Sequence, residues 1–337
     1  MRYLGVLGSA AVAAAVALGG CTSSAAPVTA DAGSVHALTL TQAQQVYDSY
    51  VEASNADAKQ GNATKALALA SDAQWAVLHS QYTALTSTGT PVTQYSYGTP
   101  AFYVPALPSY PLWFVVSVPV RTDTDGHLGP AVNTLLAFQR FNTSRLWTLD
   151  ASAVLSHPLP AIARDSDGYA IAYTASGSSL LLPPDLLGAS QAAVVDEGPA
   201  APAAAVIGSG LQTTGMYAAQ NARGNAATAQ GLNYEWLMQS ASYADYELQT
   251  AGGGALVMYG MYLNTITEHP GNVSGTPIPV PGNFAALLPA TSAKVGVHGV
   301  DANWTFEFAA VDPPQSAHGT KVDVIAGSGA PTYGHPY

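Results

Sequence analysis

The chain has 337 residues, of which 48% are hydrophobic and only 9% charged, with a formal net charge of −11. This hydrophobic content excludes a disordered chain, and the length predicts two domains because it exceeds what one small core usually holds. The 21 acidic residues outnumber the 10 basic ones and repel phosphate backbones, which argues against a nucleic-acid partner.

Residues 1–20 have the pattern of a secretory signal peptide. Arg2 precedes an uncharged apolar stretch that ends in glycines, and such a segment is too short and too interrupted to span a membrane. No later apolar run is longer than a strand. We therefore expect residues 1–20 to be removed after export.

The residues Leu18, Gly19, Gly20 and Cys21 resemble the lipobox of bacterial lipoproteins. The resemblance implies cleavage before Cys21 and attachment of diacylglyceryl and palmitate groups to that cysteine, so that the mature protein is anchored to the outer face of the cell membrane. The alternative is an ordinary signal with an incidental cysteine. Residues 21–37, rich in Ser, Ala and Thr, are predicted to form a flexible tether of roughly 20 Å.

Residues 38–187 are predicted to form a first α+β domain. Thr41 and Gln44 have the spacing of a capping box before a helix that Gly61 ends, and a second helix ends at residues 88–91. Four strands are then predicted from β-branched and aromatic runs. They cover residues 95–97, 112–120, 131–141 and 146–151.

The remainder is predicted to repeat this arrangement. Residues 188–210, rich in Pro, Gly and Ala, indicate a linker, residues 211–329 a second α+β domain and residues 330–337 a tail. The elements of this second domain are expected over residues 232–248, 255–267, 295–311 and 321–325. Runs of strands beside helices favour an α+β fold over a parallel sheet.

Two short segments suggest that the domains form a tandem repeat. NADAKQGNAT, from Asn55 to Thr64, matches NARGNAAT, from Asn221 to Thr228, and each follows an aromatic, helix-like stretch. We therefore predict two tandem domains, each with helices packed on a curved antiparallel sheet. A chance match in a chain rich in Ala and Gly is the alternative.

Domains in which helices are followed by a curved sheet resemble the cone-shaped fold shared by nuclear transport factor 2 and ketosteroid isomerase, or the related cystatin-like fold. More closely, FYVPALPSYPLWFVV (102–116), LLAFQRFNTSRLWTLDAS (135–152) and LPAIARDSDGYAIAY (159–173) resemble an uncharacterised family of actinobacterial secreted lipoproteins. That resemblance implies a location in the cell envelope and supplies no activity. The cone-shaped folds imply that an apolar cavity can hold a carboxylate base beside a tyrosine.

The sequence predicts neither a metal site nor a cofactor. The eight histidines form no His-x-x-x-His pair, and the single cysteine is assigned to lipidation. Two Asp-x-Asp-Gly stretches, at residues 123–126 and 165–168, could hold calcium, but each lacks the glutamate that an EF-hand needs at its twelfth position. We interpret both as turns. No Gly-x-Ser-x-Gly nucleophile motif occurs either.

Three carboxylates are weak candidates for a catalytic base. Glu307 alternates with Trp304, Phe306 and Phe308, which places it on the opposite face of a strand. A carboxylate in that position is usually solvated. The other two candidates, Asp245 and Glu247, share one face of a second segment.

Three tyrosines beside proline-rich loops, Tyr103, Tyr110 and Tyr262, are weak candidates for binding a partner, because tyrosine combines apolar area with a polar end. The pattern favours a non-catalytic binding or assembly module of the cell envelope that takes an envelope protein or an apolar small ligand. An envelope enzyme with a cavity carboxylate as base, or a structural spacer, are the alternatives. Burial of Glu307 or Glu247 beside a tyrosine and a cavity would favour the enzyme.

Overall fold

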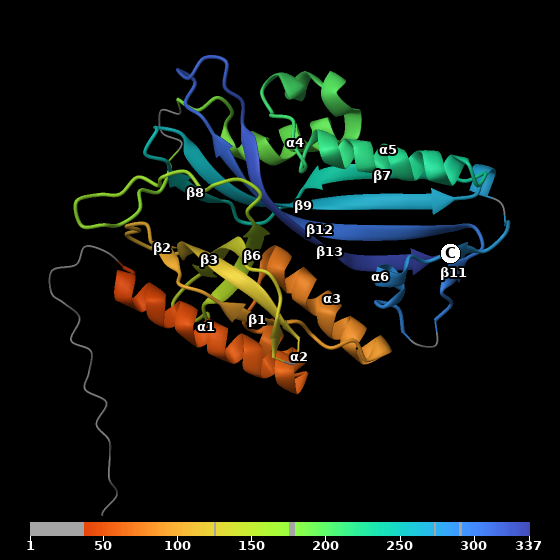
Figure 1. Ribbon diagram of the computed structural model, residues 1–337, viewed down its shortest axis with the longest axis horizontal. Helices are drawn as coiled ribbons and strands as arrows, with labels where there is room; N and C mark the ends of the chain where they lie inside the picture. The colour runs from red at the N-terminus through yellow and green to blue at the C-terminus, as the bar shows by residue number, and fades with distance from the viewer. Residues whose placement is uncertain (1–36, 125, 175–178, 273, 290–291) are drawn as a thin grey trace, which may run out of the picture. The chain divides into compact units, whose positions relative to one another are not determined.

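The computed structural model in Figure 1 describes residues 37–124, 126–174, 179–272, 274–289 and 292–337. The predicted signal peptide, the lipobox with Cys21 and all but the last residue of the tether lie outside these residues. The described residues from Ala37 to Tyr337 form one unit in space. Within it, two large antiparallel sheets are each accompanied by helices.

The first helix, α1 (Leu40–Gln60), begins and ends with standard capping structures. Thr39 Oγ1 accepts a hydrogen bond from the Gln42 amide at 3.1 Å, and Gln42 Oε1 accepts one from the Thr39 amide at 2.9 Å. Gly61 ends the helix with a φ of 64°, a conformation that glycine adopts without steric cost. The predicted helix is confirmed, although the capping box lies two residues before the predicted pair.

The first sheet follows two further helices, α2 (Ala63–Leu67) and α3 (Asp72–Thr88). Its strands are β1 (Gln94–Tyr97), β2 (Ala101–Tyr103), β3 (Leu112–Thr124), β4 (His127–Leu128), β5 (Val132–Arg140) and β6 (Thr148–Val154). They lie in the order β1-β3-β5-β6, and β2 and β4 also pair with β3. The short strands β1 and β2 pair with the later and earlier parts of β3, at residues 120–123 and 115–117.

The second domain, which contains the second sheet, repeats this strand order. Its helical segments are η1 (Pro184–Leu186), α4 (Leu187–Glu197), η2 (Gly198–Ala200), η3 (Pro202–Ala205) and α5 (Thr214–Thr228), and its strands are β7 (Asn233–Ser240), β8 (Tyr246–Gln249), β9 (Ala255–Glu268), β12 (Gly299–Asp312) and β13 (Asp323–Pro336). They lie in the order β7-β9-β12-β13. Here β7 and β8 pair with the later and earlier parts of β9, at residues 261–268 and 255–258.

Between β9 and β12, the chain forms small elements beside the second sheet: η4 (Pro270–Asn272), β10 (Ile278–Pro279), α6 (Gly282–Ala285) and β11 (Val295–Gly296). Strands β10 and β11 pair with each other. Phe284 of α6 packs edge-on against Trp304 of β12, with ring centroids 5.4 Å apart.

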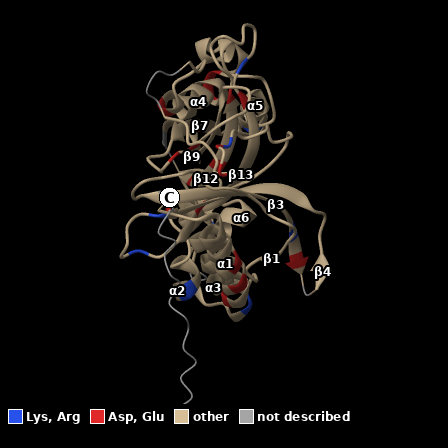
Figure 2. Cartoon of the chain, turned by 90° about the vertical axis from the view of Figure 1, so that its left-hand side faces the viewer, with Lys and Arg blue, Asp and Glu red and all other residues tan. Residues whose placement is uncertain are grey.

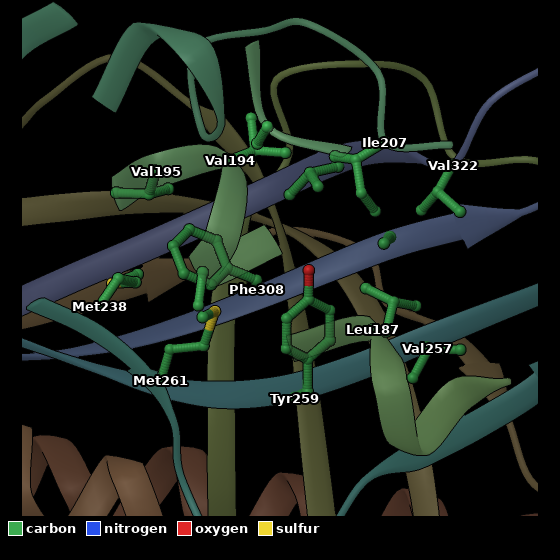
Figure 3. Close-up of a cluster of buried hydrophobic side chains, with 14 of the residues drawn as sticks. Leu187, Val194, Val195, Ile207, Met238, Val257, Tyr259, Met261, Phe308 and Val322 are labelled. Carbon is green, nitrogen blue, oxygen red and sulfur yellow. The ribbon is translucent and has the colours of Figure 1, made fainter. Parts of the chain in front are cut away.

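The helices and sheets form four layers. One face of the first sheet, with Phe114 and Phe138, packs against Tyr47 of α1. Its other face, with Leu135, packs against Met258 of the second sheet. The far face of the second sheet packs under α4, around the residues drawn in Figure 3. Figure 1 shows the result, with α1 on one side of the two sheets and α4 and α5 on the other. The predicted α+β class is confirmed.

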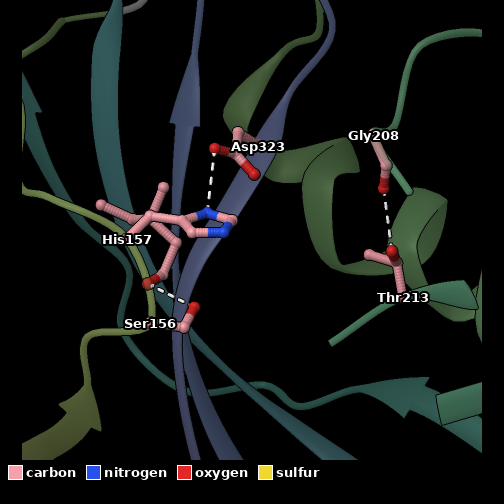
Figure 4. Close-up of polar contacts among 6 residues, drawn as sticks. Ser156, His157, Gly208, Thr213 and Asp323 are labelled. Atoms are coloured by element: carbon pink, nitrogen blue, oxygen red, sulfur yellow. Dashed lines mark hydrogen bonds and ion pairs between the residues drawn. The ribbon is translucent and has the colours of Figure 1, made fainter. Parts of the chain in front are cut away.

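Polar contacts also join the two sheets. Ser156, just after β6, donates a hydrogen bond from Oγ to the Ile325 carbonyl at 2.9 Å. The neighbouring His157 lies 3.2 Å from the Asp323 carboxylate at the start of β13, as Figure 4 shows. The same figure shows Thr213 Oγ1 donating to the Gly208 carbonyl at 2.8 Å before α5. Helix α3 contacts β6 of the first sheet and β12 and β13 of the second, so it spans the junction between the two sheets.

Two segments differ from their prediction. Residues 188–210, expected to be a linker, contain all but the first residue of α4 (Leu187–Glu197), in which Leu187, Val194 and Val195 are completely buried. Spacings of seven and eight residues place these side chains on one helical face, so the Ala-rich composition conceals a core helix. Residues 330–336, expected to be a tail, continue β13 and pair with β12. This stretch is mostly small residues and proline, which carry little strand signal.

The two asparagines of the predicted repeat make different contacts. Asn55 exchanges two hydrogen bonds with the backbone of Tyr95, at 2.7 and 3.0 Å, and so joins α1 to β1. Asn221 donates to the carbonyl of Tyr217 within its own helix at 3.1 Å. The two domains therefore share a strand order, whereas the matched asparagines do not make equivalent contacts.

Charged residues are sparse over the described chain, as Figure 2 shows. In the parts of the chain that the structure describes, no helix is long and apolar enough to cross a membrane.

Candidate functional site

The strand β12 places successive side chains in opposite environments. Phe308 packs into the core under α4, together with the partly buried Trp304 and Phe306. Glu307, on the other face, is only 2% exposed. The sequence pattern favoured a solvated carboxylate at this position, and that expectation is wrong. Elements of the first domain cover this face of β12, and the alternation of residues within one strand gives no sign of them.

The residues that surround Glu307 on β9 and β13 are small or aromatic. Gly260 pairs with Glu307 on β9, and Ser328 pairs with it on β13. The ring of Tyr243 occupies the space beside Gly260, where an added Cβ would lie 2.5 Å from the ring. Tyr262, a predicted binding residue, donates its hydroxyl proton to the Tyr243 hydroxyl. Because opposite residues of an antiparallel pair share a face, these tyrosines lie on the Glu307 side of the sheet.

Glu307 lines a cavity of about 410 Å³. Most of the wall comes from the first domain, including Tyr50 of α1 and Tyr95 and Tyr97 of β1, and residues 328–330 of β13 complete it. Polar side chains that face it include Gln74, Gln81, Thr134 and Ser152. Among the residues that the structure describes, the lining contains no Lys, Arg or His, and Glu307 is its one carboxyl group.

The surroundings of Glu307 favour its protonated form. Its Oε1 is buried and has no hydrogen-bond partner within the described residues. Burial raises the pKa of Glu307 well above its usual value, the backbone amide of Ser152 works in the opposite direction, and the nearby Asp150 raises it further. Burial also raises the pKa of Tyr50 and Tyr97. A wall of neutral hydrogen-bonding groups therefore faces the cavity.

Asp150 forms a second buried polar cluster, between the sheets. It is 2% exposed and accepts hydrogen bonds from Tyr246 Oη at 2.6 Å, from Thr148 Oγ1 at 2.7 Å and from the Ser71 hydroxyl. Burial raises the pKa of Asp150, although its three hydrogen bonds lower it. With its hydrogen bonds made, this carboxyl group is a structural link.

The other two predicted carboxylates lie away from the Glu307 cavity. Glu247 of β8 is half-buried and pairs across to Val257, on the α4 side of the second sheet. Burial, together with the carboxylates Asp245 and Asp185, raises the pKa of Glu247 to about 7. The side chain of Asp245 is exposed to solvent. Neither lines the cavity of Glu307.

The predicted tyrosines lie in three different places. Tyr103 has the Arg164 guanidinium 5.2 Å from its ring centre, and Tyr110 has that of Arg140 at 5.9 Å. Tyr110 lines a separate depression beside α1. Of the three, only Tyr262 is on the same sheet face as Glu307.

The first aspartate of each Asp-x-Asp-Gly stretch stabilises a turn. Asp123 accepts a hydrogen bond from the Gly126 amide at 2.8 Å, and Asp165 accepts from the amides of Asp167 and Tyr169 at 3.0 and 2.9 Å. Over the described residues, no group of three or more His, Cys, Asp or Glu side chains is arranged to hold a metal ion.

Sequence reasoning missed Tyr50, Tyr95 and Tyr97 as cavity residues. It placed all three on an expected helix or strand, but it did not bring α1, β1 and β12 together. Asp150 carried a detectable signal, because it is the single acidic residue of the run from Leu146 to Val154. A carboxylate in such an apolar strand requires hydrogen-bonding partners.

Comparisons with known proteins give a family but no activity. The family described as Domain of unknown function (DUF8094) matches residues 34–332. An uncharacterized lipoprotein of Streptomyces avermitilis is 26% identical over 162 residues, which are 47% of this chain and 44% of that protein. One of Streptomyces coelicolor is 25% identical over 191 residues, which are 56% and 53% of the two chains.

The chain therefore spans about half the length of the curated relatives that it matches. No solved structure matches it. The resemblance to the cone-shaped and cystatin-like folds accordingly stays a prediction.

Proposed function

We propose that this chain, which belongs to the family described as Domain of unknown function (DUF8094), is an envelope lipoprotein that binds a small uncharged ligand in the Glu307 cavity without altering it. The observation that carries the proposal is the buried Oε1 of Glu307, which has no partner among the described residues and belongs to a side chain that lines the cavity. Leaving a buried oxygen unpaired is costly, and a ligand group would pair it.

The size and lining of the cavity define the ligand class. A volume of about 410 Å³ falls within the range of small-molecule sites. The wall has no cation to neutralise an anion. The protonated Glu307 would donate a hydrogen bond to a carbonyl or hydroxyl oxygen, and Tyr50, Tyr95 and Tyr97 offer apolar area for the rest of the ligand.

The membrane location rests on the relatives and on the N-terminus. Both curated relatives are called lipoproteins, and Cys21 follows the lipobox-like residues 18–20. Metabolic labelling with a clickable palmitate tests this part of the proposal. We expect label on the wild type and none on Cys21→Ala, and equal labelling of both proteins would overturn the anchor.

The shared strand order supports a tandem repeat. In both sheets, two early strands pair with opposite ends of the same long strand, and two further strands extend the sheet from there. We interpret the two halves as duplicated α+β domains that share the ligand cavity, with most of the wall from the first domain and Glu307 from the second.

Native mass spectrometry of protein extracted from its own membrane tests ligand binding. We expect the wild type and Glu307→Gln to retain the same ligand mass, because the amide still donates a hydrogen bond. Glu307→Leu, which cannot donate, should lose at least about tenfold in occupancy, the equivalent of one such hydrogen bond. Glu247→Gln, which makes the same change outside the cavity, is the matched control and should behave as the wild type.

Two results would contradict this assignment. Equal losses in Glu307→Gln and Glu307→Leu would mean that the ligand is a cation paired with the carboxylate. Equal retention by all variants would mean that the ligand lies elsewhere or that the protein acts as a spacer.

The burial of Glu307 also favours the alternative of a catalytic base, since its raised pKa suits proton transfer. In that case the ligand recovered from the wild type would differ chemically from the ligand recovered from Glu307→Gln. Identical ligands from both proteins support a binding role.

A further inference from the structure

The loop between β5 and β6 exposes two large apolar side chains. Phe141 is 66% exposed and Leu146 67%. They line one depression together with Trp75 of α3, which is 43% exposed and stacks on His79. The inner wall of this depression is polar and includes Asp72 and the hydrogen-bonded Asp150. Exposed apolar side chains are common singly, but three around the rim of one depression indicate a surface that another apolar phase covers.

Hydrogen bonds hold this loop in one shape. Arg140 donates from Nε to the Arg145 carbonyl at 2.9 Å and from Nη2 to the Thr143 carbonyl at 2.7 Å. Asn142 Oδ1 accepts from the amide and the hydroxyl of Ser144, at 2.9 and 2.7 Å. The conformation that presents Phe141 and Leu146 is therefore fixed before any contact is made, which lowers the entropic cost of docking.

The charge of the loop is unusual for this chain. The protein has 10 basic and 21 acidic residues, yet residues 140–147 contain two arginines and no acidic residue. The side chain of Arg145 is exposed beside Leu146. An apolar pair flanked by a cation suits an interface between acyl chains and anionic headgroups.

The anchored end of the chain leaves the fold beside this loop. Ala37 and Leu38 line a second depression together with Arg140, Leu146 and Trp147. Fifteen residues separate Cys21 from Ala37, and the sixteen Cα–Cα steps between the two span at most about 55 Å. A lipid on Cys21 would keep the loop close to the membrane at high effective concentration, so a weak contact would be sufficient.

We propose that the loop of residues 141–146 inserts Phe141 and Leu146 into the anionic surface of the membrane to which the protein is anchored. This inference rests on the proposed lipoprotein function, and it adds an orientation. The β5–β6 end of the first domain faces the lipid.

Vesicle co-sedimentation tests the contact without the acyl chains. The protein is produced from residue 22 on, which retains every described helix and strand and carries no lipid. We expect salt-sensitive binding to vesicles in which part of the phosphatidylcholine is replaced by phosphatidylglycerol, and little binding to pure phosphatidylcholine. The double variant Phe141→Ser/Leu146→Ser should bind at least about tenfold more weakly, because two apolar anchors are lost. Arg145→Gln should lose most of the preference for phosphatidylglycerol.

Leu211→Ser is the matched control, since Leu211 is 72% exposed in the second domain and should not affect binding. Near-ultraviolet circular dichroism checks that each variant is folded. Equal binding by the wild type and the folded double variant would overturn the proposal, as would the absence of binding to any vesicle, which would point to a protein partner for this surface. The palmitate labelling of Cys21 is independent of both results, so a failed anchor and a failed loop contact are distinguishable.

Discussion

The two faces of β12 place a phenylalanine and a glutamate one residue apart in unlike surroundings. On the α4 side, Phe308 is completely buried among aliphatic and aromatic side chains, including Tyr259, 6.0 Å away between ring centres. Figure 3 shows Phe308 among Val194, Val195, Met238 and Met261. On the other side, Glu307 lines a cavity that the first domain provides.

The second sheet is tightly packed on its α4 side, whereas a cavity remains on its Glu307 side. The second sheet is closed on its far side by α4, which lies directly on its strands. The first domain packs α1 over its sheet but leaves space between α1, α3 and β1, where Glu307 enters from the second domain. Substitutions on the α4 side should therefore change stability alone, whereas those that alter the wall of the Glu307 cavity should change ligand binding as well.

The largest effect is expected for Phe308→Ala. Removing a fully buried phenylalanine leaves a cavity in a packed core, and such substitutions lower the free energy of unfolding by about 3–5 kcal/mol. Phe308→Leu, which keeps most of the volume, should cost less than about 1.5 kcal/mol. Urea unfolding measures both. Equal costs for the two variants would show that packing around the ring does not stabilise this face.

The sequence predicted most of the elements because their signals are local. Gly61 and Gly89 end the two main helices of the first domain at the expected positions, and the long strands of both sheets overlap the expected apolar runs. The strand alternation also placed Glu307 opposite Phe308.

The features that the sequence did not predict depend on contacts between distant segments. The burial of Glu307 requires the first domain to cover β12, and no pattern within residues 303–308 reports that. The bond from Tyr246 to Asp150 joins residues 96 positions apart. Helix α4 was missed because Ala, Gly and Pro dominate the segment around it, although Leu187, Val194 and Val195 share a helical face.

The second-largest effect on stability is expected at the hydrogen bond that links the two domains. Tyr246→Phe removes the hydroxyl that donates to Asp150 Oδ2 and accepts from Gln139 Nε2 at 3.1 Å. Because Asp150 stays buried with one partner fewer, we expect a loss of about 1–3 kcal/mol in the free energy of unfolding. Tyr333→Phe, at a tyrosine that is 46% exposed, is the control for loss of a hydroxyl. A Tyr246→Phe variant as stable as the wild type would mean that water replaces the lost partner.

A similar or slightly smaller effect is expected for Gly260→Ala. The added methyl would lie 2.5 Å from the Tyr243 ring, so the ring must move away from its position near Glu307. Overpacking of this kind costs about 1–3 kcal/mol. Gly282→Ala, where nothing lies within 4 Å of the added Cβ, should change stability little. Native mass spectrometry would show whether the displaced ring also weakens ligand retention, and unchanged stability would mean that Tyr243 is free to shift.

The smallest effect concerns the pH dependence of Glu247, on the filled side of the second sheet. Burial and the neighbouring Asp245 and Asp185 raise its pKa to about 7 from 4.5. Between these pH values the folded state binds more protons than the unfolded state, so stability falls as the pH rises through this range. Because the side chain is half-exposed, solvent screening should keep the change below about 1 kcal/mol.

Urea unfolding of Glu247→Gln from pH 4 to pH 8 measures this contribution. We expect the variant to lose less stability across that range than the wild type does, because the amide does not titrate. Glu52→Gln, at an exposed position of α1, removes the same charge from solvent and should leave the pH profile unchanged. Parallel profiles for the wild type and Glu247→Gln would mean that partial burial and the neighbouring carboxylates do not raise the pKa of Glu247 in the folded state.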